Sequence, residues 1–477
     1  MWGESSDLVN DTLCNAVVSA GIFSQLNQEQ TDKIVTAVYE AGLSNRVKLA
    51  KMAAEETGMG NWKDKTLKNA VATQYVYESI KNQKTAGIIS ENFESGISEI
   101  AQPIGPILAI IPCTNPTSTV MFKILIALKT RNPIIISAHH RALESCRETV
   151  RICYEAALGA DAPEDCIIFF ERGSREDTKN LMCDKRLALI LATGGEGVVK
   201  AAYSSGTPAL GVGAGNVPVY VEGSADVPFA AEQILISKTF DNGTICASEQ
   251  SIVVEQQLSE QLKQELIARG AYFLSGEEIA AIEKVAYDKE KQTMAADIVG
   301  QSAKRAAEMA GLNIPDGVRL LVAPQKHVGY DYPLSCEILA PIIAYYTVSG
   351  FDEAVKHCID LNFHGGIGHT VSIYSNDEEK IKAFGMTMNA GRVLVNTPSS
   401  QGAVGGMFNT LTPSLTLGCG TGGKNITMDN VSARHLLNIQ RLARRRVNER
   451  MANFDSSLYF DENIDAKEIA KRFNINH

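Results

Sequence analysis

Residues Leu187–Gly197, with the sequence LALILATGGEG, join an apolar run directly to a glycine-rich turn. The pattern predicts a strand that ends at this turn and a helix through Val198–Ser205. Glycines at such a turn leave backbone N–H groups free to face a phosphate at the helix N-terminus. The strict Gly-x-Gly-x-x-Gly pattern is absent here. The turn alone therefore leaves two interpretations open, a nucleotide site and an ordinary glycine-rich connection.

Short apolar runs alternate with longer amphipathic stretches on both sides of this turn. They are Leu108–Pro112, Pro133–Ser137 and Cys166–Phe170 before it, and Ser251–Glu255, Val318–Val322, Thr370–Tyr374 and Arg392–Asn396 after it. This alternation predicts parallel sheets with helices on both faces. Because 477 residues are too many for one compact core, we expect two consecutive α/β lobes.

The ends of the chain follow other patterns. Partial β-type alternation over Thr85–Gln102 predicts a hairpin. Near the C-terminus we expect a short strand at Ser457–Phe460 and a helix over Asp465–Phe473. The basic run Arg441–Arg446 is interpreted as a solvated helix face or a subunit contact.

Composition excludes several classes of function. A net charge of −10 argues against nucleic-acid and anionic-membrane partners, which need excess lysine and arginine. Ten dispersed cysteines fit free thiols in a reducing cytoplasm, and neither Cys-x-x-Cys nor His-Glu-x-x-His occurs, so no metal site is expected. The longest apolar run, Ile104–Pro112, is too short to span a membrane.

Two further segments are candidates for chemistry. The glycine-rich run Gly206–Asn216 would let a flat ligand approach the backbone, although a flexible connection explains it equally well. Cys246 lies among small and polar residues in Thr239–Gln250 rather than on an apolar face. A nucleophilic thiol needs exposure and a stabilised thiolate, which such surroundings favour over apolar ones.

A series of motifs runs in order along the chain. They are Pro112–Ser118 (PCTNPTS), Ala192–Gly195 (ATGG), Lys200–Gly206 (KAAYSSG), Gly211–Asn216 (GVGAGN), Phe240–Gly243 (FDNG), Ile245–Gln250 (ICASEQ), Gly365–Thr370 (GGIGHT), Asn396–Gly402 (NTPSSQG) and Leu415–Gly420 (LTLGCG). From about Gln28 to Phe460 the sequence resembles the aldehyde dehydrogenase superfamily. It is most similar to the CoA-acylating branch, in particular the aldehyde dehydrogenase half of bifunctional aldehyde–alcohol dehydrogenases.

The resemblance implies an α/β fold of the aldehyde dehydrogenase type, with two Rossmann-type lobes and a small β oligomerisation element. The implied divisions are a cofactor domain over 1–222, interrupted by an oligomerisation hairpin near 85–105, a catalytic domain over 223–420, and a C-terminal oligomerisation segment and tail over 421–477. We therefore expect a homo-oligomer.

The resemblance also assigns roles to four residues. Cys246 matches the thiol that attacks the aldehyde and passes through a thiohemiacetal to a thioester. Asn115 matches the donor to the developing oxyanion, an interaction typically worth about 3 kcal/mol of barrier. Glu337 matches the carboxylate that holds the nicotinamide ribose. His369 matches a histidine of the acylating branch, a proton carrier for the CoA thiol or, in the alternative, a packed core residue.

The remaining implied contacts concern cofactor and substrate. NAD is expected at Thr193, Gly194, Gly195, Gly197, Ser137 and Gly213, with CoA as co-substrate. The stretch Ser137–His140 (SAHH) departs from the branch's Ser-Pro-His-Pro, which makes a preference for NAD over NADP less secure. Lys424 replaces a neutral residue near the substrate region and suggests an anionic aldehyde such as sulfoacetaldehyde or succinate semialdehyde. An acetaldehyde-like substrate and a surface lysine are the alternatives.

Three functions remain open on the sequence. Hydrolytic members of the superfamily carry a glutamate in a Glu-Leu-Gly-Gly-Lys segment, and the corresponding Gly211–Asn216 has no carboxylate. This absence favours CoA over water as acyl acceptor. The alternatives are a hydrolytic enzyme that releases free acid and a non-catalytic assembly protein that retains the fold.

Overall fold

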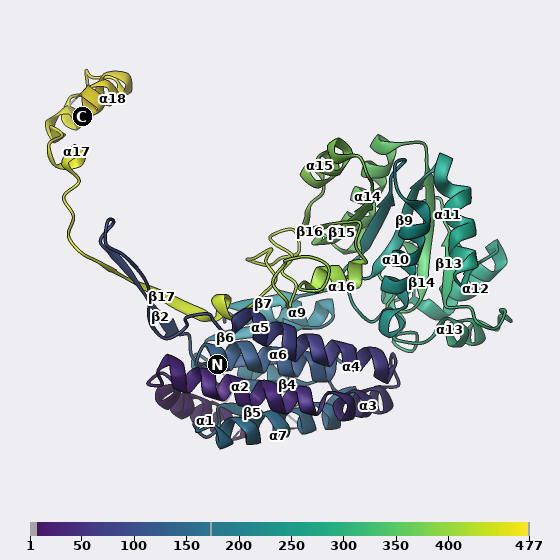
Figure 1. Ribbon diagram of the computed structural model, residues 1–477, viewed down its shortest axis with the longest axis horizontal. Helices are drawn as coiled ribbons and strands as arrows, with labels where there is room; N and C mark the ends of the chain where they lie inside the picture. Colours follow the sequence, from purple (N-terminus) through teal and green to yellow (C-terminus); the bar gives the residue numbers. More distant parts are fainter. Residues whose placement is uncertain (1–6, 172–173, 476–477) are drawn as a thin grey trace.

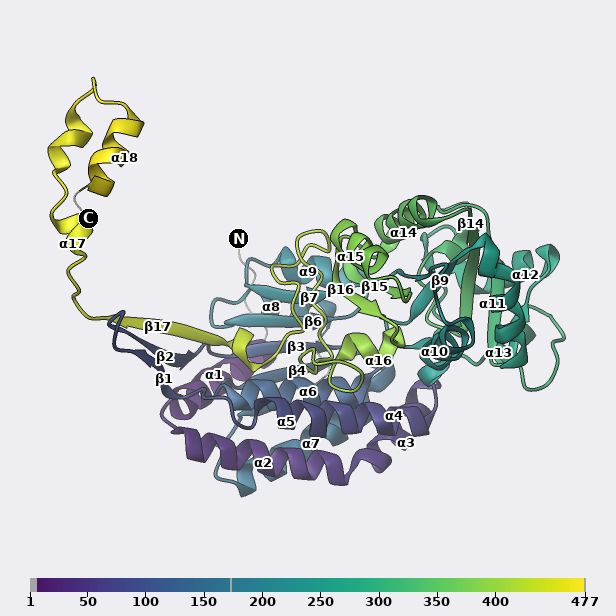
Figure 2. The ribbon, with the colours of Figure 1, turned by 45° about the horizontal axis from the view of Figure 1, so that its top comes forward.

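The computed structural model describes residues 7–171 and 174–475. It shows two α/β units side by side and an arm that leads away from them, carrying the C-terminal helices (Figure 1). The same separation of arm and body is visible in a second view (Figure 2). The mixed α/β architecture predicted from the alternating pattern is confirmed.

The first unit is built on a five-stranded parallel sheet of order β5-β4-β3-β6-β7. The strands are β3 Ile107–Ile111, β4 Ile134–Ala138, β5 Ile167–Phe169, β6 Leu189–Thr193 and β7 Ala209–Val212. In chain order this is 3-2-1-4-5, the Rossmann arrangement, whose strand order reverses between β3 and β6. The four strands predicted here are confirmed, and β7 was missed inside the glycine-rich run.

Helices cover both faces of this sheet. They are α1 Asp7–Phe23, α2 Gln28–Ser44, α3 Arg46–Thr57, α4 Trp62–Ala70, the π-helical turn η1 Val71–Tyr75, α5 Val76–Ile80, α6 Pro116–Lys129, η2 His140–Ala142, α7 Leu143–Gly159, α8 Arg175–Cys183 and α9 Glu196–Tyr203. Asn27 caps α2 with a capping box to Gln30. Every residue of α6 is buried, because its apolar surface packs between the sheet and the outer helices.

The second unit holds a seven-stranded parallel sheet of order β10-β13-β14-β9-β8-β15-β16. Its strands are β8 Val217–Val221, β9 Glu249–Glu255, β10 Ala271–Phe273, β13 Leu320–Pro324, β14 Ile342–Val348, β15 Gly368–Tyr374 and β16 Ala390–Val395, and a small hairpin adds β11 Tyr287–Asp288 and β12 Thr293–Met294. Its helices are α10 Val227–Thr239, η3 Phe240–Gly243, α11 Gln256–Ala268, α12 Gly276–Ala286, α13 Ala303–Met309, η4 Pro333–Ser335, α14 Phe351–Gly365, α15 Glu378–Thr387 and α16 Ser399–Val404. β8 pairs in this sheet although it precedes residue 222, and the division into domains stays a prediction.

The arm begins in a three-stranded antiparallel sheet, which the predicted hairpin and a late strand form together. Strands β1 Gly87–Asn92 and β2 Ile97–Pro103 are the hairpin, and β17 Leu437–Ala443 pairs with β2. Beyond η5 Ala433–Leu436 and this sheet lie α17 Glu449–Ala452, η6 Ser456–Phe460 and α18 Ala466–Ile475.

The arm corrects two expectations from the sequence and confirms a third. The expected strand at Ser457–Phe460 is wrong, because this segment is a helical turn with no strand assigned beside it in the described residues. The basic run Arg441–Arg446 begins inside β17, which ends at Ala443, and continues into the non-helical chain after it. The expected helix face is therefore also wrong. The helix near Asp465–Phe473 is confirmed as α18. No helix in the described part of the chain has the length and apolar character to cross a membrane.

Candidate active site

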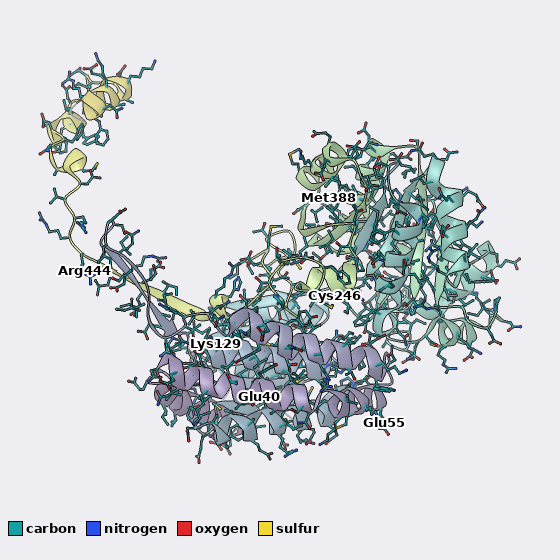
Figure 3. The ribbon with its side chains drawn as sticks, in the orientation of Figure 1. Glu40, Glu55, Lys129, Cys246, Met388 and Arg444 are labelled. Atoms are coloured by element: carbon teal, nitrogen blue, oxygen red, sulfur yellow. The ribbon has the colours of Figure 1, made fainter. Side chains whose placement is uncertain are left out.

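A cavity of about 1050 Å³ lies where the two units meet. Its walls include the loops at the carboxyl ends of β3, β4 and β6, the edge at which Rossmann sheets bind their ligands. The opposite wall comes from the loop before β9, the segment after η4 and the C-terminal end of α14. Cys246 is in this wall, and Figure 3 places it between the two units.

The loop that carries Cys246 has an unusual backbone. Asp241 and Asn242 adopt left-handed conformations with φ of 47° and 53°, and Gly243 follows with φ of 72°. A Cβ at Gly243 would lie 2.9 Å from the carbonyl oxygen of Ala340, so this position accepts only glycine without a shift. The chain then turns through Cys246 directly into β9.

His369 lies next to the cysteine. Its Nε2 is 3.2 Å from Cys246 Sγ, and its Nδ1 is 2.9 Å from the Thr370 hydroxyl. Arg392 fixes this arrangement by donating from Nε to the Thr370 hydroxyl at 3.1 Å and from its Nη2 to the His369 carbonyl. With the proton on Nδ1, the Nε2 lone pair faces the thiol and can accept its proton.

Burial keeps both partners neutral. Desolvation, together with Glu337, raises the pKa of the Cys246 thiol to about 12. Desolvation and the nearby Arg392 lower the pKa of His369 to about 3. The stabilised thiolate expected from the sequence is therefore wrong for the protein alone. A cation beside the sulfur, such as an oxidised nicotinamide ring, would favour thiolate formation.

Asn115 reaches the same loop from the first unit. It precedes α6, whose first residue is Pro116, and its Nδ2 donates to the Thr244 carbonyl at 3.3 Å. Its Oδ1 accepts from Lys68 Nζ at 2.5 Å. The amide therefore lies two residues from Cys246 with its orientation fixed.

Glu337 and the glycine-rich run meet behind the cysteine. The Gly215 N–H donates to Glu337 Oε1 at 3.0 Å, and burial raises the pKa of this carboxyl to about 7. A Cβ at Gly215 would lie 2.4 Å from the Cys246 carbonyl oxygen and 3.2 Å from the His369 ring. Gly215 therefore allows close backbone packing against Cys246 and His369, a role that was not predicted from the sequence.

The other predicted contacts divide into two groups. Thr193, Gly194, Gly195 and Gly213 line the cavity, whereas Ser137, Gly197 and Lys424 are not among its lining residues. The Thr193 hydroxyl is buried without a hydrogen-bond partner in the described residues, and α9 begins just beyond Gly195. An unsatisfied hydroxyl beside a helix N-terminus fits the phosphates of a dinucleotide. Lys424 is exposed on a turn with φ of 59°.

Comparison with known proteins decides the family. Residues 4–411 match the model of the aldehyde dehydrogenase family. The chain belongs to the aldehyde dehydrogenase family. The bifunctional aldehyde-alcohol dehydrogenase of Escherichia coli K12 is 43% identical over 442 residues, which are 92% of this chain and 49% of that protein. The chain thus spans about half the length of this curated relative.

Two solved structures share the fold over nearly their whole length. The acetylating aldehyde dehydrogenase of Geobacillus thermoglucosidasius is 46% identical, with a TM-score of 0.90 over 92% of this chain and 97% of that one. The propionaldehyde dehydrogenase of Rhodopseudomonas palustris, with bound CoA and an acylated cysteine, is 25% identical, with a TM-score of 0.82 over 91% and 97%. The resemblance to acylating aldehyde dehydrogenases and the predicted fold class are confirmed.

The structure adds residues to the candidate site that sequence reasoning missed. A second cysteine–histidine pair, Cys336 and His364, lines the cavity with Sγ and Nε2 3.2 Å apart. Lys68 contacts Asn115 and also lines the cavity. Cys336 directly precedes Glu337, which was the one signal available for it. No sequence pattern indicated Lys68, because its partners lie 47 to 176 positions away.

Proposed function

We propose that this protein is a CoA-acylating aldehyde dehydrogenase, which converts a short aldehyde, NAD and CoA reversibly into an acyl-CoA and NADH. The observation that carries the proposal is the pairing of Cys246 with His369 at 3.2 Å, beside the Asn115 amide in a cavity large enough for cofactor and substrate. Each of these three features matches a need of thiol-based aldehyde oxidation.

The residues act in sequence. Cys246 passes its proton to His369 Nε2 as its sulfur attacks the carbonyl carbon of the aldehyde. The oxyanion of the resulting thiohemiacetal accepts from a backbone N–H of the Cys246 loop and from Asn115 Nδ2, which exchanges its long bond to the Thr244 carbonyl for the oxyanion. With NAD bound, the nicotinamide would supply the hydride acceptor as the carbonyl re-forms, and a thioester would remain on Cys246. His369 releases its proton, which is the one proton that the net reaction gives; the CoA thiol then attacks the thioester, and its proton passes to the departing Cys246 sulfur.

Cofactor binding is assigned to the first unit and Glu337. Thr193, Gly194 and Gly195 would hold the pyrophosphate at the start of α9, and Glu337 would accept from ribose hydroxyls. We favour NAD as the cofactor. The loop after β4 lines the cavity with His139, His140 and Arg141, and these could also accept a ribose phosphate. A comparison of NAD with NADP is therefore part of the test.

The choice of acyl acceptor rests on the groups around Cys246. Gly213–Asn216 brings backbone and small side chains to the cavity side of the thioester but no carboxylate. Water without a positioned base is a poor nucleophile, whereas a thiol needs less activation. One observation favours the hydrolytic alternative: Glu337, with its pKa raised to about 7, is close enough to Cys246 to affect its titration.

The substrate and the assembly are further parts of the proposal. The cavity lining includes the apolar side chains of Val71, Phe240, Val404 and Leu415, which favour a short uncharged aldehyde. An anionic aldehyde would require Lys424 to reach the cavity from its exposed turn. The sheet of β1, β2 and β17 projects from the body and is suited to contacts in a homo-oligomer.

The experiment measures NADH and acyl-CoA formation from acetaldehyde, propionaldehyde, sulfoacetaldehyde and succinate semialdehyde, with NAD or NADP and with or without CoA. We expect sustained NADH formation only with CoA, in equal amounts with acyl-CoA. Steady release of free acid without CoA would replace this function with the hydrolytic one. Absence of NADH with every aldehyde would favour the non-catalytic alternative.

A further inference from the structure

A buried lysine connects the N-terminal helices to the proposed oxyanion site. Lys68 of α4 donates from Nζ to Asn115 Oδ1 at 2.5 Å, to Asp241 Oδ2 at 2.5 Å and to the Thr244 hydroxyl at 2.8 Å. The three acceptors use all three ammonium protons. Since only 4% of the lysine is exposed, water cannot replace these partners without opening the packing.

The contact with Lys68 determines which way the Asn115 amide faces. An ammonium group only donates, so the oxygen of the amide must point toward Lys68 and its nitrogen away from it. Asn115 Nδ2 accordingly donates to the Thr244 carbonyl at 3.3 Å and to the Thr114 hydroxyl at 3.0 Å. Without the lysine, a flipped amide would present its oxygen to the thiohemiacetal oxyanion and repel it.

Asp241 keeps the lysine in place and joins it to the cysteine loop. Besides Lys68, its carboxylate accepts from Lys65 Nζ at 2.9 Å, from the Asn61 N–H at 2.8 Å and from the Thr244 hydroxyl at 2.8 Å. The left-handed backbone at Asp241 turns this side chain toward α4. Two ammonium groups share one fully buried carboxylate here, and Asp64 is a further acidic neighbour, so the cluster is balanced in charge while the Lys68 ammonium lies directly against Asn115 Oδ1.

We infer that Lys68 is a positioning residue for the oxyanion site, which fixes the orientation of the Asn115 amide and polarises its N–H with a buried positive charge. This inference rests on the proposed function, because it assigns Lys68 a part in thiohemiacetal formation at Cys246. A positive charge beside the amide oxygen polarises the amide, so its N–H group becomes a stronger hydrogen-bond donor to the oxyanion.

The charge on Lys68 gives the inference a pH signature. Desolvation lowers the pKa of Lys68 to about 8, against the opposing attraction of Asp241 and with added repulsion from Lys65. Below about pH 8 the lysine is protonated and supports Asn115. As pH rises through about 8 it loses its proton, and the part of kcat that depends on its charge is lost.

Lys65 provides a matched control. It lies one turn away on α4, is equally buried, and binds Asp241 and the Thr114 carbonyl, but it has no contact with Asn115 among the described residues. Lys68→Met should lower kcat about 100-fold, the usual loss for an oxyanion donor, with KM for NAD within two-fold of wild type. Lys65→Met should keep kcat within about five-fold, even if both variants lower Tm by similar amounts.

Lys68→Gln separates orientation from charge, because glutamine can still donate to Asn115 Oδ1. We expect it to recover part of the lost kcat and to remove the inflection near pH 8. Equal kcat losses in Lys65→Met and Lys68→Met at equal Tm losses, or an unchanged inflection in Lys68→Gln, would overturn the inference.

A crystal structure of Lys68→Met tests the inference without any turnover. We expect the Asn115 side chain to be rotated away from the Thr244 carbonyl, and an unmoved amide would contradict the positioning role. If wild type forms no NADH with any aldehyde, the proposed function fails, and this structure still decides whether Lys68 orients Asn115.

Discussion

Two cysteines in the wall of one cavity each have Sγ 3.2 Å from Nε2 of a histidine, and of the two histidines His364 lines the cavity whereas His369 lies behind the wall. The pairs differ in what surrounds them. His369 is fully buried and held through Thr370 and Arg392, and Cys246 lies beside the Asn115 amide. His364 is half-buried and packs edge-on against the Tyr330 ring, with ring centroids 4.7 Å apart.

A short distance between cysteine and histidine does not by itself make a reactive pair. Around Cys246 the loop geometry brings an amide donor, a backbone turn and an anchored imidazole together on one side of the sulfur. Beside Cys336, the amide of Asn216 donates to the carbonyls of Ser335 and Leu361 and is not among the cavity-lining residues, whereas Asn115 lines the cavity. Stabilisation of the oxyanion, not the thiol itself, therefore distinguishes the two sites.

Removal of each thiol tests this distinction most strongly. Cys246→Ala should abolish NADH formation, because no other group forms the covalent intermediate, while NAD still binds. Cys336→Ala should retain kcat within about three-fold of wild type. Initial rates of NADH absorbance and equilibrium titration with NAD measure the two effects. More than a trace of turnover in Cys246→Ala would assign the nucleophile to another residue.

Substitution of the two histidines should change kcat by different factors, and the difference should be smaller than for the two cysteines. His369→Gln should lower kcat by about 100-fold, since it removes the acceptor of the thiol proton. His364→Gln should change kcat by less than about three-fold, because its partner takes no part in the chemistry. Steady-state kinetics at saturating aldehyde, NAD and CoA measure both. A larger loss in His364→Gln than in His369→Gln would reverse the assignment.

Protonation of Glu337 should make KM for NAD depend on pH. Because burial raises its pKa to about 7, the carboxylate becomes neutral as pH falls through that value and loses its attraction for ribose hydroxyls. KM for NAD should therefore rise about ten-fold from pH 8 to pH 6 in wild type and stay constant in Glu337→Gln.

Glu249 is the matched control for this pH effect. It is buried with a pKa raised to about 7, accepts from the Ser399 N–H and is not a cavity-lining residue. Glu249→Gln should keep the rise in KM at low pH. If that rise disappears in Glu249→Gln and persists in Glu337→Gln, ribose binding by Glu337 is wrong.

The smallest effect concerns Lys424. Because this lysine is exposed and outside the cavity lining, Lys424→Ala should change KM by less than two-fold for both acetaldehyde and sulfoacetaldehyde. A selective increase in KM for sulfoacetaldehyde would show that the turn carries Lys424 to the substrate, as the sequence suggested.

Local sequence patterns predicted the strands and helices of this molecule better than the contacts between them. The runs around β3, β4, β5 and β6 could be predicted because each is apolar and is followed by a longer helical stretch. Strand β7 was missed because Gly211 interrupts its apolar pattern, and β8 because Pro218 lies inside it. The turn at Ser457–Phe460 contains the aromatic residues Tyr459 and Phe460, which favour strands, but pairing depends on a neighbour that no local pattern reveals.

The same limit applies to the site. Cys246, Asn115, Glu337 and His369 could be proposed from motifs, and the structure places the first three in the lining of one cavity and His369 next to Cys246. Lys68 and Asp241 could not be connected, because burial and a left-handed turn join them across 173 positions. The neutral state of Cys246 also depends on desolvation, which arises only when both units enclose the sulfur.

Acyl transfer through Cys246 is tested most directly by mass spectrometry of the protein after incubation with propionaldehyde and NAD in the absence of CoA. The account predicts one propionyl group per chain on the peptide that contains Cys246, none on the peptide that contains Cys336, and complete release as propionyl-CoA when CoA is added. Acylation of Cys336, or accumulation of free propionate without CoA from an unmodified protein, would contradict it.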